Sequence, residues 1–273
     1  MPELPEVETI VRDLRARIPG STIRKVSVTR PDILASGTAA TFQRRLRGRR
    51  IERVERRAKS IVLQLDDTST LAVSLGMTGR LVAAEAKRAS ELRHVAVRFD
   101  LDDGRALLYD DARRFGRLQH FPPGYWQHRD SQFGLEPLSE DFTAARLFEL
   151  TRRSRSPMRN WLLDPYRVAG VGNIYANEAL FRARVRPTRR AHKITRAESV
   201  LLHDALRAVL QQAIDRRGTT LNNYRDASGE EGDYYAQLQV YGREAEPCVR
   251  CRTPIKRIVL SNRSAYYCPK CQR

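Results

Sequence analysis

The stretch 94–100, HVAVRFD, decides the class of fold. Its apolar side chains Val95, Val97 and Phe99 alternate with three others, His94, Ala96 and Arg98. Because successive side chains of a β-strand point to opposite faces, the alternation predicts a strand with one buried face and one open face.

Similar short runs fill the surrounding residues 22–120. They are IRKVSV (23–28), RRIERV (49–54), SIVLQL (60–65), TLAVSL (70–75) and RALLYD (105–110). Asp-Gly, Gly and Pro turns join them, which is typical of antiparallel strands. The pattern therefore predicts an antiparallel β-sandwich or barrel over this part of the chain.

Helical patterns flank the β region on both sides. Residues 3–18 carry apolar side chains at spacings of three and four, and Pro19-Gly20 ends the run. After the turn-rich segment 121–141, helical spacing returns in 145–153, 157–164, 173–184 and 195–216. We predict an α+β fold with an N-terminal helix and β-sandwich (1–135), a helical domain (136–235) and a cysteine-containing domain (236–273).

The charge of the chain favours a polyanionic partner. Among 273 residues, 50 Lys and Arg outnumber 32 Asp and Glu, which gives a net charge of +18. Such an excess is typical of nucleic-acid-binding proteins. The sequence has neither a long apolar run nor a secretory signal, so we expect a cytoplasmic protein without a membrane span. A monomer is the simplest expectation.

Four cysteines at the C-terminal end predict a metal site. They form two Cys-x2-Cys pairs, Cys248 with Cys251 and Cys268 with Cys271. Two such pairs supply four thiolates to one tetrahedral Zn²⁺, and the sequence between them reads as a β-hairpin. We therefore predict one structural zinc ion; four unliganded thiols or a redox pair are the alternatives.

The chain opens with MPELPE, in which a proline precedes two acids. A small second residue permits removal of Met1, which would leave Pro2 with a free secondary amine, a potential nucleophile toward a sugar carbon. The positive end of a helix favours the unprotonated amine, and Glu3 and Glu6 are placed to transfer protons beside it. The same residues also suit a purely structural helix start.

Six segments occur in one order along the chain: PELPEVE (2–8), RRAKS (56–60), LGMTG (75–79), DARRFG (111–116), GVGNIYANEALF (170–181) and the cysteine ribbon. Together they resemble the formamidopyrimidine-DNA glycosylases, bacterial base-excision enzymes for oxidised purines. PELPE and RRFG favour this branch over the related endonuclease VIII branch. The resemblance implies a helix–two-turn–helix (H2TH) module in the helical domain, a C-terminal zinc-finger hairpin and a nucleoid-associated location.

The resemblance also implies a partner and a chemistry. The partner is double-stranded DNA that contains oxidised bases or abasic sites, and the target nucleotide is flipped out of the duplex. Pro2 is then the nucleophile that forms a Schiff base, Glu3 the general acid and Glu6 its support. Lys59 assists strand cleavage by β-elimination, and Arg263 the following δ-elimination.

Several DNA contacts are implied as well. Met77, Arg113 and Phe115 resemble the wedge that fills the space left by the flipped nucleotide, although Met and Phe also suit a core. The residues implied near phosphates are His94, Arg114, Arg155, Arg159, Asn173 and Arg263. Asn173 follows two glycines at a helix start, which suits a bound anion and equally an ordinary helix cap.

The chain departs from the family pattern at three places, of which Asn222-Asn223 leaves the lesion preference open. Ala112 stands where the family loop commonly has proline, Arg159 stands where lysine is common, and Asn222-Asn223 replace an Arg-Asp pair. Two rival hypotheses remain. One is the same chemistry on oxidised pyrimidines, and the other is a non-catalytic zinc-ribbon protein that binds DNA.

Overall fold

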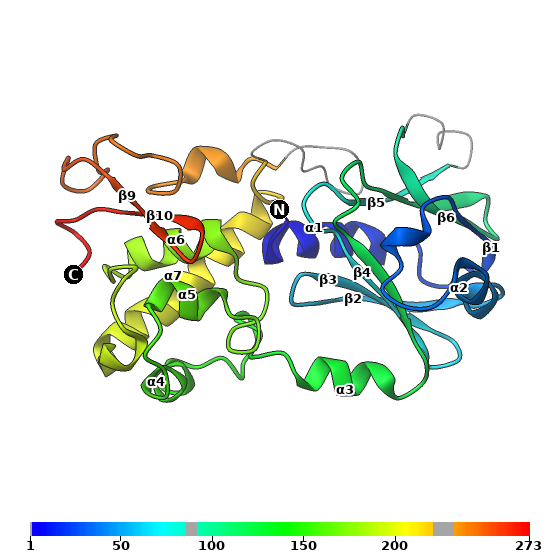
Figure 1. Ribbon diagram of the computed structural model, residues 1–273, viewed down its shortest axis with the longest axis horizontal. Coiled ribbons are helices and arrows are strands. Elements are labelled where there is room, and N and C mark those ends of the chain that lie inside the picture. Colours follow the sequence, from blue (N-terminus) through cyan, green and yellow to red (C-terminus); the bar gives the residue numbers. More distant parts are fainter. Residues whose placement is uncertain (1, 86–91, 221–231) are drawn as a thin grey trace. The chain divides into compact units, whose positions relative to one another are not determined.

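The computed structural model describes residues 2–85, 92–220 and 232–273 (Figure 1). The chain divides into two compact units. Unit 1 comprises Met1–Gln132 and Arg216–Asp233, and unit 2 comprises Phe133–Asp215 and Tyr234–Arg273. The chain therefore leaves unit 1 after Gln132, returns to it at Arg216 for a short segment, and ends in unit 2. The predicted domain limits after residues 135 and 235 stay a prediction.

Unit 1 contains two four-stranded sheets. One has the strand order β1-β6-β7-β5 and the other has the order β2-β3-β4-β8, with antiparallel neighbours in both. The strands are β1 (Ile23–Val28), β2 (Ile51–Arg57), β3 (Ser60–Leu65), β4 (Thr70–Ser74), β5 (Arg80–Glu85), β6 (Val95–Leu101), β7 (Arg105–Asp110) and β8 (Arg117–Phe121).

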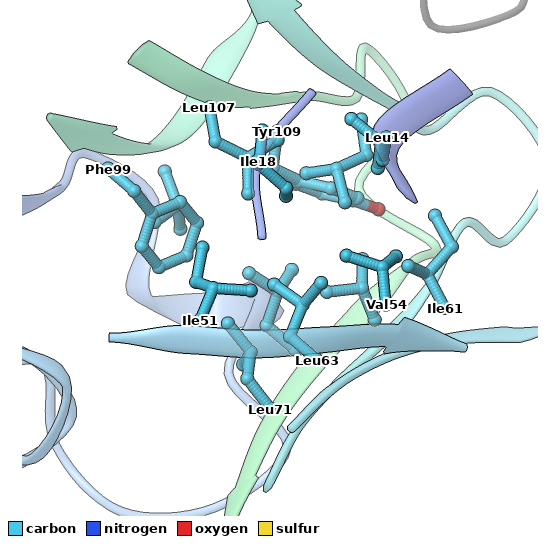
Figure 2. Close-up of a cluster of buried hydrophobic side chains, with 14 of the residues drawn as sticks. Leu14, Ile18, Ile51, Val54, Ile61, Leu63, Leu71, Phe99, Leu107 and Tyr109 are labelled. Carbon is cyan, nitrogen blue, oxygen red and sulfur yellow. The ribbon is translucent and has the colours of Figure 1, made fainter. Parts of the chain in front are cut away.

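The inner faces of the two sheets share one hydrophobic core (Figure 2). Leu63 and Leu71 of one sheet and Phe99 and Leu107 of the other are all buried in it. Packing sheet against sheet removes this apolar area from water, which is the main favourable term in folding. The predicted α+β class with an antiparallel β-sandwich is confirmed.

Helix α1 (Leu4–Arg15) adds an apolar stripe to this core. Its buried residues include Leu4, Val7, Val11 and Leu14, at the spacings that predict the helix. Ile18 is also completely buried, although the helix ends at Arg15 and Ala16 is its C-cap. The apolar pattern therefore continues to Ile18, three positions beyond the last residue of the helix.

Strand β6 differs in one detail from the alternation expected of HVAVRFD. Ala96 is completely buried, although the alternation places it on the open face. The pairing of β6 with β7 shifts register between Val95 and Val97, as at a β-bulge. A bulge adds one residue to one strand and breaks strict alternation there.

The sequence pattern does not predict four elements of unit 1. Two are the edge strands β5 and β8, and two are the short helices α2 (Ala39–Leu46) and α3 (Tyr125–Ser131). Helix α2 buries only Phe42 and Leu46, and α3 buries only Trp126. So few buried positions give no clear helical period.

Unit 2 contains four longer helices among its described residues. They are α4 (Ala144–Arg152), α5 (Met158–Leu163), α6 (Asn173–Arg182) and α7 (Arg196–Asp215), each of which overlaps a stretch of predicted helical spacing. The short segments Ala191–Lys193 and Tyr234–Gln237 form single 3₁₀ turns. In the part of the chain that the structure describes, no helix combines the length and the apolar character needed to cross a membrane.

Glu178 ties α6 to the segment that leads into the cysteine ribbon. Its side chain is completely buried, and its carboxylate accepts the backbone N–H groups of Gln239, Val240 and Tyr241 at 2.9, 2.9 and 2.8 Å. Burial raises the pKa of Glu178, and the three amide donors oppose this by stabilising the carboxylate. This contact fixes where the ribbon begins.

The ribbon contains the predicted hairpin, with strands β9 (Lys256–Leu260) and β10 (Arg263–Tyr267) paired antiparallel. It packs on α6 through a small core whose buried members are Phe181, Val240, Cys248, Ile255 and Cys268. The Arg250 guanidinium lies 4.7 Å from the centroid of the Phe181 ring and donates to the Phe181 carbonyl at 3.2 Å. The hairpin is thus anchored to the helical part of unit 2.

Candidate functional site

The start of α1 brings Pro2, Glu3 and Glu6 together. All three are buried, and Glu3 and Glu6 are only 3% and 2% exposed. Glu3 is the N-cap and forms a capping box with Glu6, whose Oε2 accepts the Glu3 backbone N–H at 2.7 Å. Pro2 therefore directly precedes two acids at the positive end of a helix. These contacts are those of a structural helix start, and they leave both acids beside Pro2.

The second oxygen of Glu6 binds a distant part of the chain. Glu6 Oε1 accepts the backbone N–H of Thr219 at 2.8 Å, across a separation of 213 positions. Gly218 permits this approach, because its φ is +87° and a Cβ there would lie 2.9 Å from the Glu6 Cγ. The Glu6 carboxylate therefore joins α1 to the segment just before residues 221–231.

Lys59 lies at the tip of the hairpin between β2 and β3. Arg57 pairs with Ser60, so Ala58 and Lys59 form a two-residue turn. Ala58 has a φ of +53°, the left-handed conformation that tight hairpin turns require. The half-buried lysine is therefore held on a short turn with a defined backbone.

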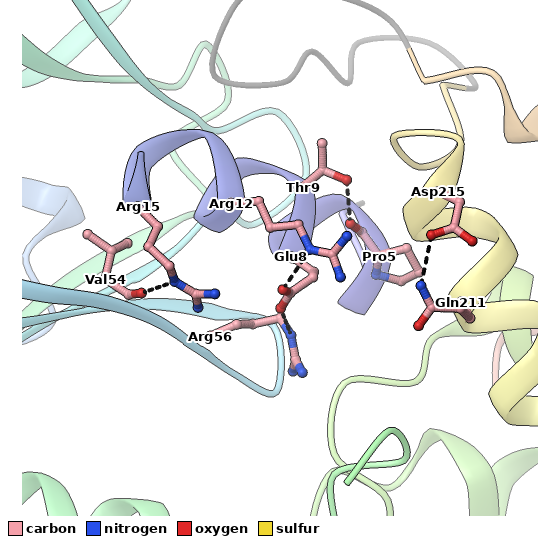
Figure 3. Close-up of polar contacts among 9 residues, drawn as sticks. All are labelled: Pro5, Glu8, Thr9, Arg12, Arg15, Val54, Arg56, Gln211 and Asp215. Carbon is pink, nitrogen blue, oxygen red and sulfur yellow. Dashed lines mark hydrogen bonds and ion pairs between the residues drawn. The ribbon is translucent and has the colours of Figure 1, made fainter. Parts of the chain in front are cut away.

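Arg56 fixes this turn to α1 (Figure 3). Its guanidinium donates to the Ala58 carbonyl at 3.1 Å. It also donates to Glu8 Oε2 at 2.9 Å, the contact drawn in Figure 3. The side chains of Arg56 and Glu8 are only 9% and 14% exposed, so solvent screens this ion pair weakly. Glu8 belongs to the same helix as Glu3 and Glu6. The pair thus couples the lysine turn to the helix that carries the two acids.

Two adjacent loops present the predicted wedge residues. Met77 is 42% exposed and Phe115 is 53% exposed, so neither is a core residue. The Arg113 guanidinium lies 4.6 Å from the centroid of the Phe115 ring, as in a cation–π contact. The loops touch at Gly76, which has a φ of +60° and where a Cβ would lie 2.5 Å from the Gly116 nitrogen. Only glycine permits this approach.

A buried carboxylate, Asp111, joins the two loops. Its Oδ1 accepts the Thr78 hydroxyl at 2.5 Å and the Arg113 N–H at 3.2 Å. Its Oδ2 accepts the Gly116 N–H at 2.9 Å and the Tyr109 hydroxyl at 3.1 Å. Burial, together with the charge of Asp111, raises the pKa of Tyr109. Sequence reasoning misses Asp111, for which the one signal is an acid at the start of DARRFG.

Replacing Asp111 by asparagine is expected to loosen both loops. One backbone N–H faces each oxygen, that of Arg113 at Oδ1 and that of Gly116 at Oδ2, so the NH₂ of an asparagine must face an N–H group that it cannot accept. We expect the free energy of unfolding to fall by about 2 to 3 kcal/mol, as for a buried donor left without its charged acceptor. Denaturant unfolding measures this loss, and the Arg113 and Gly116 amides should exchange hydrogen faster.

Asp32→Asn is the matched control for that variant. Asp32 pairs with Arg114 of the same loop at 3.2 Å, but the two side chains are 52% and 51% exposed. An exposed pair contributes at most about 1 kcal/mol, so Asp32→Asn should change the stability little. Equal destabilisation in the two variants would contradict a clamp centred on Asp111.

The residues of unit 1 that are predicted near phosphates share one hollow. His94 and Arg114 line a cavity of about 460 Å³, together with Arg30 and Arg93. Ala112, the first departure from the family pattern, is exposed and lines it too. The lining includes three arginines and one acid, Asp111, so its net charge is positive and suits phosphate.

In unit 2, Arg159 and Asn173 both contact the hairpin. Arg159 is 1% exposed and donates to the carbonyls of Leu260 at 3.0 Å and Ser264 at 3.1 Å. Asn173, the first residue of α6, donates to the same Ser264 carbonyl at 3.0 Å. Burial lowers the pKa of Arg159, while the side chain of Arg155 is exposed. The structure thus places Arg159 inside unit 2, and DNA contacts of both arginines stay predictions.

Arg263 follows directly after the hairpin turn. Ser261 and Asn262 have φ values of +45° and +60°, as in a two-residue type I′ turn, and Arg263 pairs with Leu260 across it. Arg263 is exposed at this tip. The last departure from the family pattern, Asn222-Asn223, lies outside the described residues.

The four cysteines converge as their spacing predicts. Their Sγ atoms all lie within 4.8 Å of one another, with Cys248 to Cys271 at 3.9 Å and Cys251 to Cys268 at 3.4 Å. Zn–S bonds of about 2.3 Å in a tetrahedron place the sulfur atoms about 3.8 Å apart, so the donor set fits one zinc ion. Four protein ligands fill that tetrahedron, as in a structural site.

Three family models match successive parts of the chain. Residues 1–118 match the formamidopyrimidine-DNA glycosylase N-terminal domain, and residues 133–225 match the formamidopyrimidine-DNA glycosylase H2TH domain. Residues 245–273 match a zinc finger found in FPG and IleRS. With the four-cysteine cluster, this last match supports one structural zinc ion.

Individual relatives match over the full length. The formamidopyrimidine-DNA glycosylase of Chloroflexus aurantiacus is 43% identical over 272 residues, which cover 100% of this chain and 98% of the relative. The crystal structure of the MutM (Fpg) protein of Thermus thermophilus has a TM-score of 0.87 at 39% identity, covering 99% and 98% of the two chains. A Lactococcus lactis Fpg mutant in complex with Fapy-dG containing DNA has a TM-score of 0.92 at 31% identity, covering 100% of both.

Proposed function

The chain belongs to the formamidopyrimidine-DNA glycosylase family, and from this premise we propose that it excises oxidised purines from duplex DNA and then cleaves the damaged strand. As a member of the family it is a DNA glycosylase that acts on damaged DNA in base excision repair. The finer proposal covers 8-oxoguanine and formamidopyrimidines as substrates and an AP lyase activity. The observation that carries it is Pro2, set directly ahead of two buried acids at a helix start.

The proposed partner is duplex DNA that contains an oxidised base or an abasic site. The net charge of +18 supports a polyanionic partner, and the basic hollow beside the exposed loops supports contact with phosphates. Exposed Met77 and Phe115 support a wedge, because apolar side chains that enter a base step stabilise a flipped-out nucleotide. The stacking of Arg113 on Phe115 supports the proposal that Arg113 pairs with the base left unpaired.

In the proposed first step the Pro2 nitrogen attacks C1′ of the flipped nucleotide. A C–N bond forms, the bond from C1′ to the base breaks, and the base leaves with a proton. The sugar ring then opens as Glu3 delivers a proton to the ring oxygen, and a Schiff base joins Pro2 to C1′. Because the amine is secondary, this iminium carries a permanent positive charge that withdraws electrons from the sugar.

Two eliminations follow in the proposal. A proton leaves C2′ as the 3′ phosphate departs, and then a proton leaves C4′ as the 5′ phosphate departs. Water finally hydrolyses the imine and frees Pro2. Lys59 assists the first elimination from its turn, and Arg263 assists the second from the hairpin tip.

Glu6 has a supporting role in this scheme. Both of its carboxylate oxygens already accept backbone N–H groups, from Glu3 and from Thr219. These two bonds hold the Glu6 carboxylate in place between the helix start and residue 219. Glu6 therefore positions the helix start, and Glu3 carries the proton.

The proposal is tested with a panel of defined duplexes. We expect the protein to release base and nick strand at 8-oxoguanine and formamidopyrimidine lesions, and to leave undamaged duplex intact. Cleavage at thymine glycol should be at least about tenfold slower, in the range that pocket contacts provide. Single-turnover rates on each duplex measure this preference.

Two outcomes would change the assignment. Faster cleavage at thymine glycol than at 8-oxoguanine would move the substrate class to oxidised pyrimidines. Normal binding of every duplex with no cleavage at any lesion would indicate a non-catalytic binding protein. Release of the base without cleavage of the strand would contradict only the proposed AP lyase activity.

A further inference from the structure

A second basic surface lies on unit 1, between strand β1 and helix α2. A hollow of about 810 Å³ is lined there by Arg24, Lys25, Val26, Gln43, Arg44, Arg47 and Gly48, with no acidic residue among them. We call it the β1–α2 groove. The Gly48 N–H donates to the Ile23 carbonyl at 2.7 Å and holds the end of α2 against β1. Figure 1 shows α2 on the side of unit 1 away from the first turn of α1.

Two backbone features direct four cations into this groove. Strand β1 shifts register against β6 between Ile23 and Lys25, and both Arg24 and Lys25 are exposed where a regular strand would alternate. On α2, Arg44 lies in the last turn and Arg47 is the C-cap. Residues three apart on a helix lie on the same side, so these two arginines reach the same groove.

These four cations have no ion-pair partner among the described residues, whereas many other arginines of unit 1 have one. Arg49 pairs with Asp67 at 3.0 Å, and Arg98 pairs with Asp100 at 2.6 Å. Asp100 is the carboxylate opposite Lys25 in the sheet, and Arg98 already engages it. Like charges gathered around one hollow repel each other, and an anion in the hollow relieves that repulsion.

We propose that the β1–α2 groove binds the phosphate backbone of a second segment of duplex DNA. Four exposed cations spread over a strand and a helix suit a polyanion better than a single phosphate. Duplex DNA is the polyanion that a DNA glycosylase meets at high local concentration. A protein that holds two segments can pass from one to the other directly, without returning to free solution. This inference goes beyond the excision reaction and does not depend on it.

The test is an energy-transfer assay with undamaged DNA. Two short duplexes, one with a donor dye and one with an acceptor dye, are mixed with the full chain at a concentration where sedimentation shows a monomer. Wild-type protein should bring the dyes together, and excess protein should separate them again. In Arg44→Gln/Arg47→Gln the affinity for the second duplex should fall at least about tenfold. The slope of log Kd against log salt should fall by about 1.8, or about 0.9 for each phosphate that is no longer neutralised.

The matched control is Arg45→Gln/Arg53→Gln, which removes the same charge. Arg45 is exposed on α2 without lining the groove, and Arg53 is exposed on β2. This control should bridge the duplexes as the wild type does. Equal loss of bridging in the two double variants, or normal bridging in Arg44→Gln/Arg47→Gln, would overturn the inference.

Two further results separate this inference from other readings. A wild-type protein that never bridges duplexes but binds poly-glutamate through Arg44 and Arg47 would assign the groove to an acidic protein, and the inference would be wrong. Lack of lesion excision bears on the proposed function alone, because every probe in the bridging assay is undamaged. The two proposals can therefore fail separately.

Discussion

Protein that keeps its Met1–Pro2 peptide bond is expected to show no excision and no borohydride-trapped adduct. The Pro2 nitrogen is then an amide, whose lone pair is delocalised and cannot attack C1′. Pro2→Gly restores an amine but loses the ring that fixes its position, so the trapped adduct should fall at least about a hundredfold, as for a misplaced reactive group. Mass spectrometry of the N-terminus and gel analysis of the treated lesion duplex measure both effects.

Pro5→Ala is the matched control for this experiment. Pro5 is buried in the same first turn of α1, so the change alters the helix start but leaves the Pro2 amine in place. This variant should keep its trapped adduct even where it lowers stability. Full activity in material that still carries Met1 would remove Pro2 as the nucleophile, and the proposed chemistry with it.

Removal of zinc is expected to unfold the C-terminal hairpin and to weaken binding of a lesion duplex at least about tenfold. Binding of structural zinc contributes about 10 to 16 kcal/mol in zinc-finger peptides, and the small core around Phe181 offers little to replace it. Without the hairpin, Arg263 loses its position and several phosphates lose their cationic partners together. During chelation, limited proteolysis after residue 245 measures unfolding of the hairpin, and the Kd for the lesion duplex measures the loss of binding.

Restoring zinc should restore both the resistance to proteolysis and the Kd. Arg263→Gln, in which the metal ligands are untouched, separates the loss of one side chain from the loss of the hairpin. A metal-free protein that bound the lesion duplex with an unchanged Kd would show that the hairpin takes no part in DNA binding.

Local patterns in the sequence predict most of the fold, because they report which face of each element is buried. The inner strands β3, β6 and β7 have clear apolar patterns, and α1 has a clear helical period. The strands β5 and β8 escape prediction, although the other two edge strands, β1 and β2, are predicted. Strand β5 has the unbroken apolar run LVAA (81–84) in place of alternation, and β8 buries only Leu118. The bulge at Ala96 also escapes, since it depends on how β6 pairs with β7.

The site is predictable where its members are close in sequence. The spacing of Glu3 and Glu6 behind Pro2 already indicates a helix start, and the structure contains that capping box. The pairing of Arg56 with Glu8 is not predictable, because it joins a strand to a helix 48 positions away. The role of Asp111 is likewise not predictable from the sequence, since it arises only when two separate loops meet around this residue.

The bond between Glu6 and Thr219 has a consequence for biosynthesis. Ribosomes deliver α1 first, whereas the amide of Thr219 emerges 213 positions later. Until then one oxygen of the Glu6 carboxylate has no Thr219 amide to bind, and α1 lacks its contact with residue 219. Nascent chains that stop before Thr219 therefore lack this bond, so maturation of the helix start waits for translation to pass Thr219.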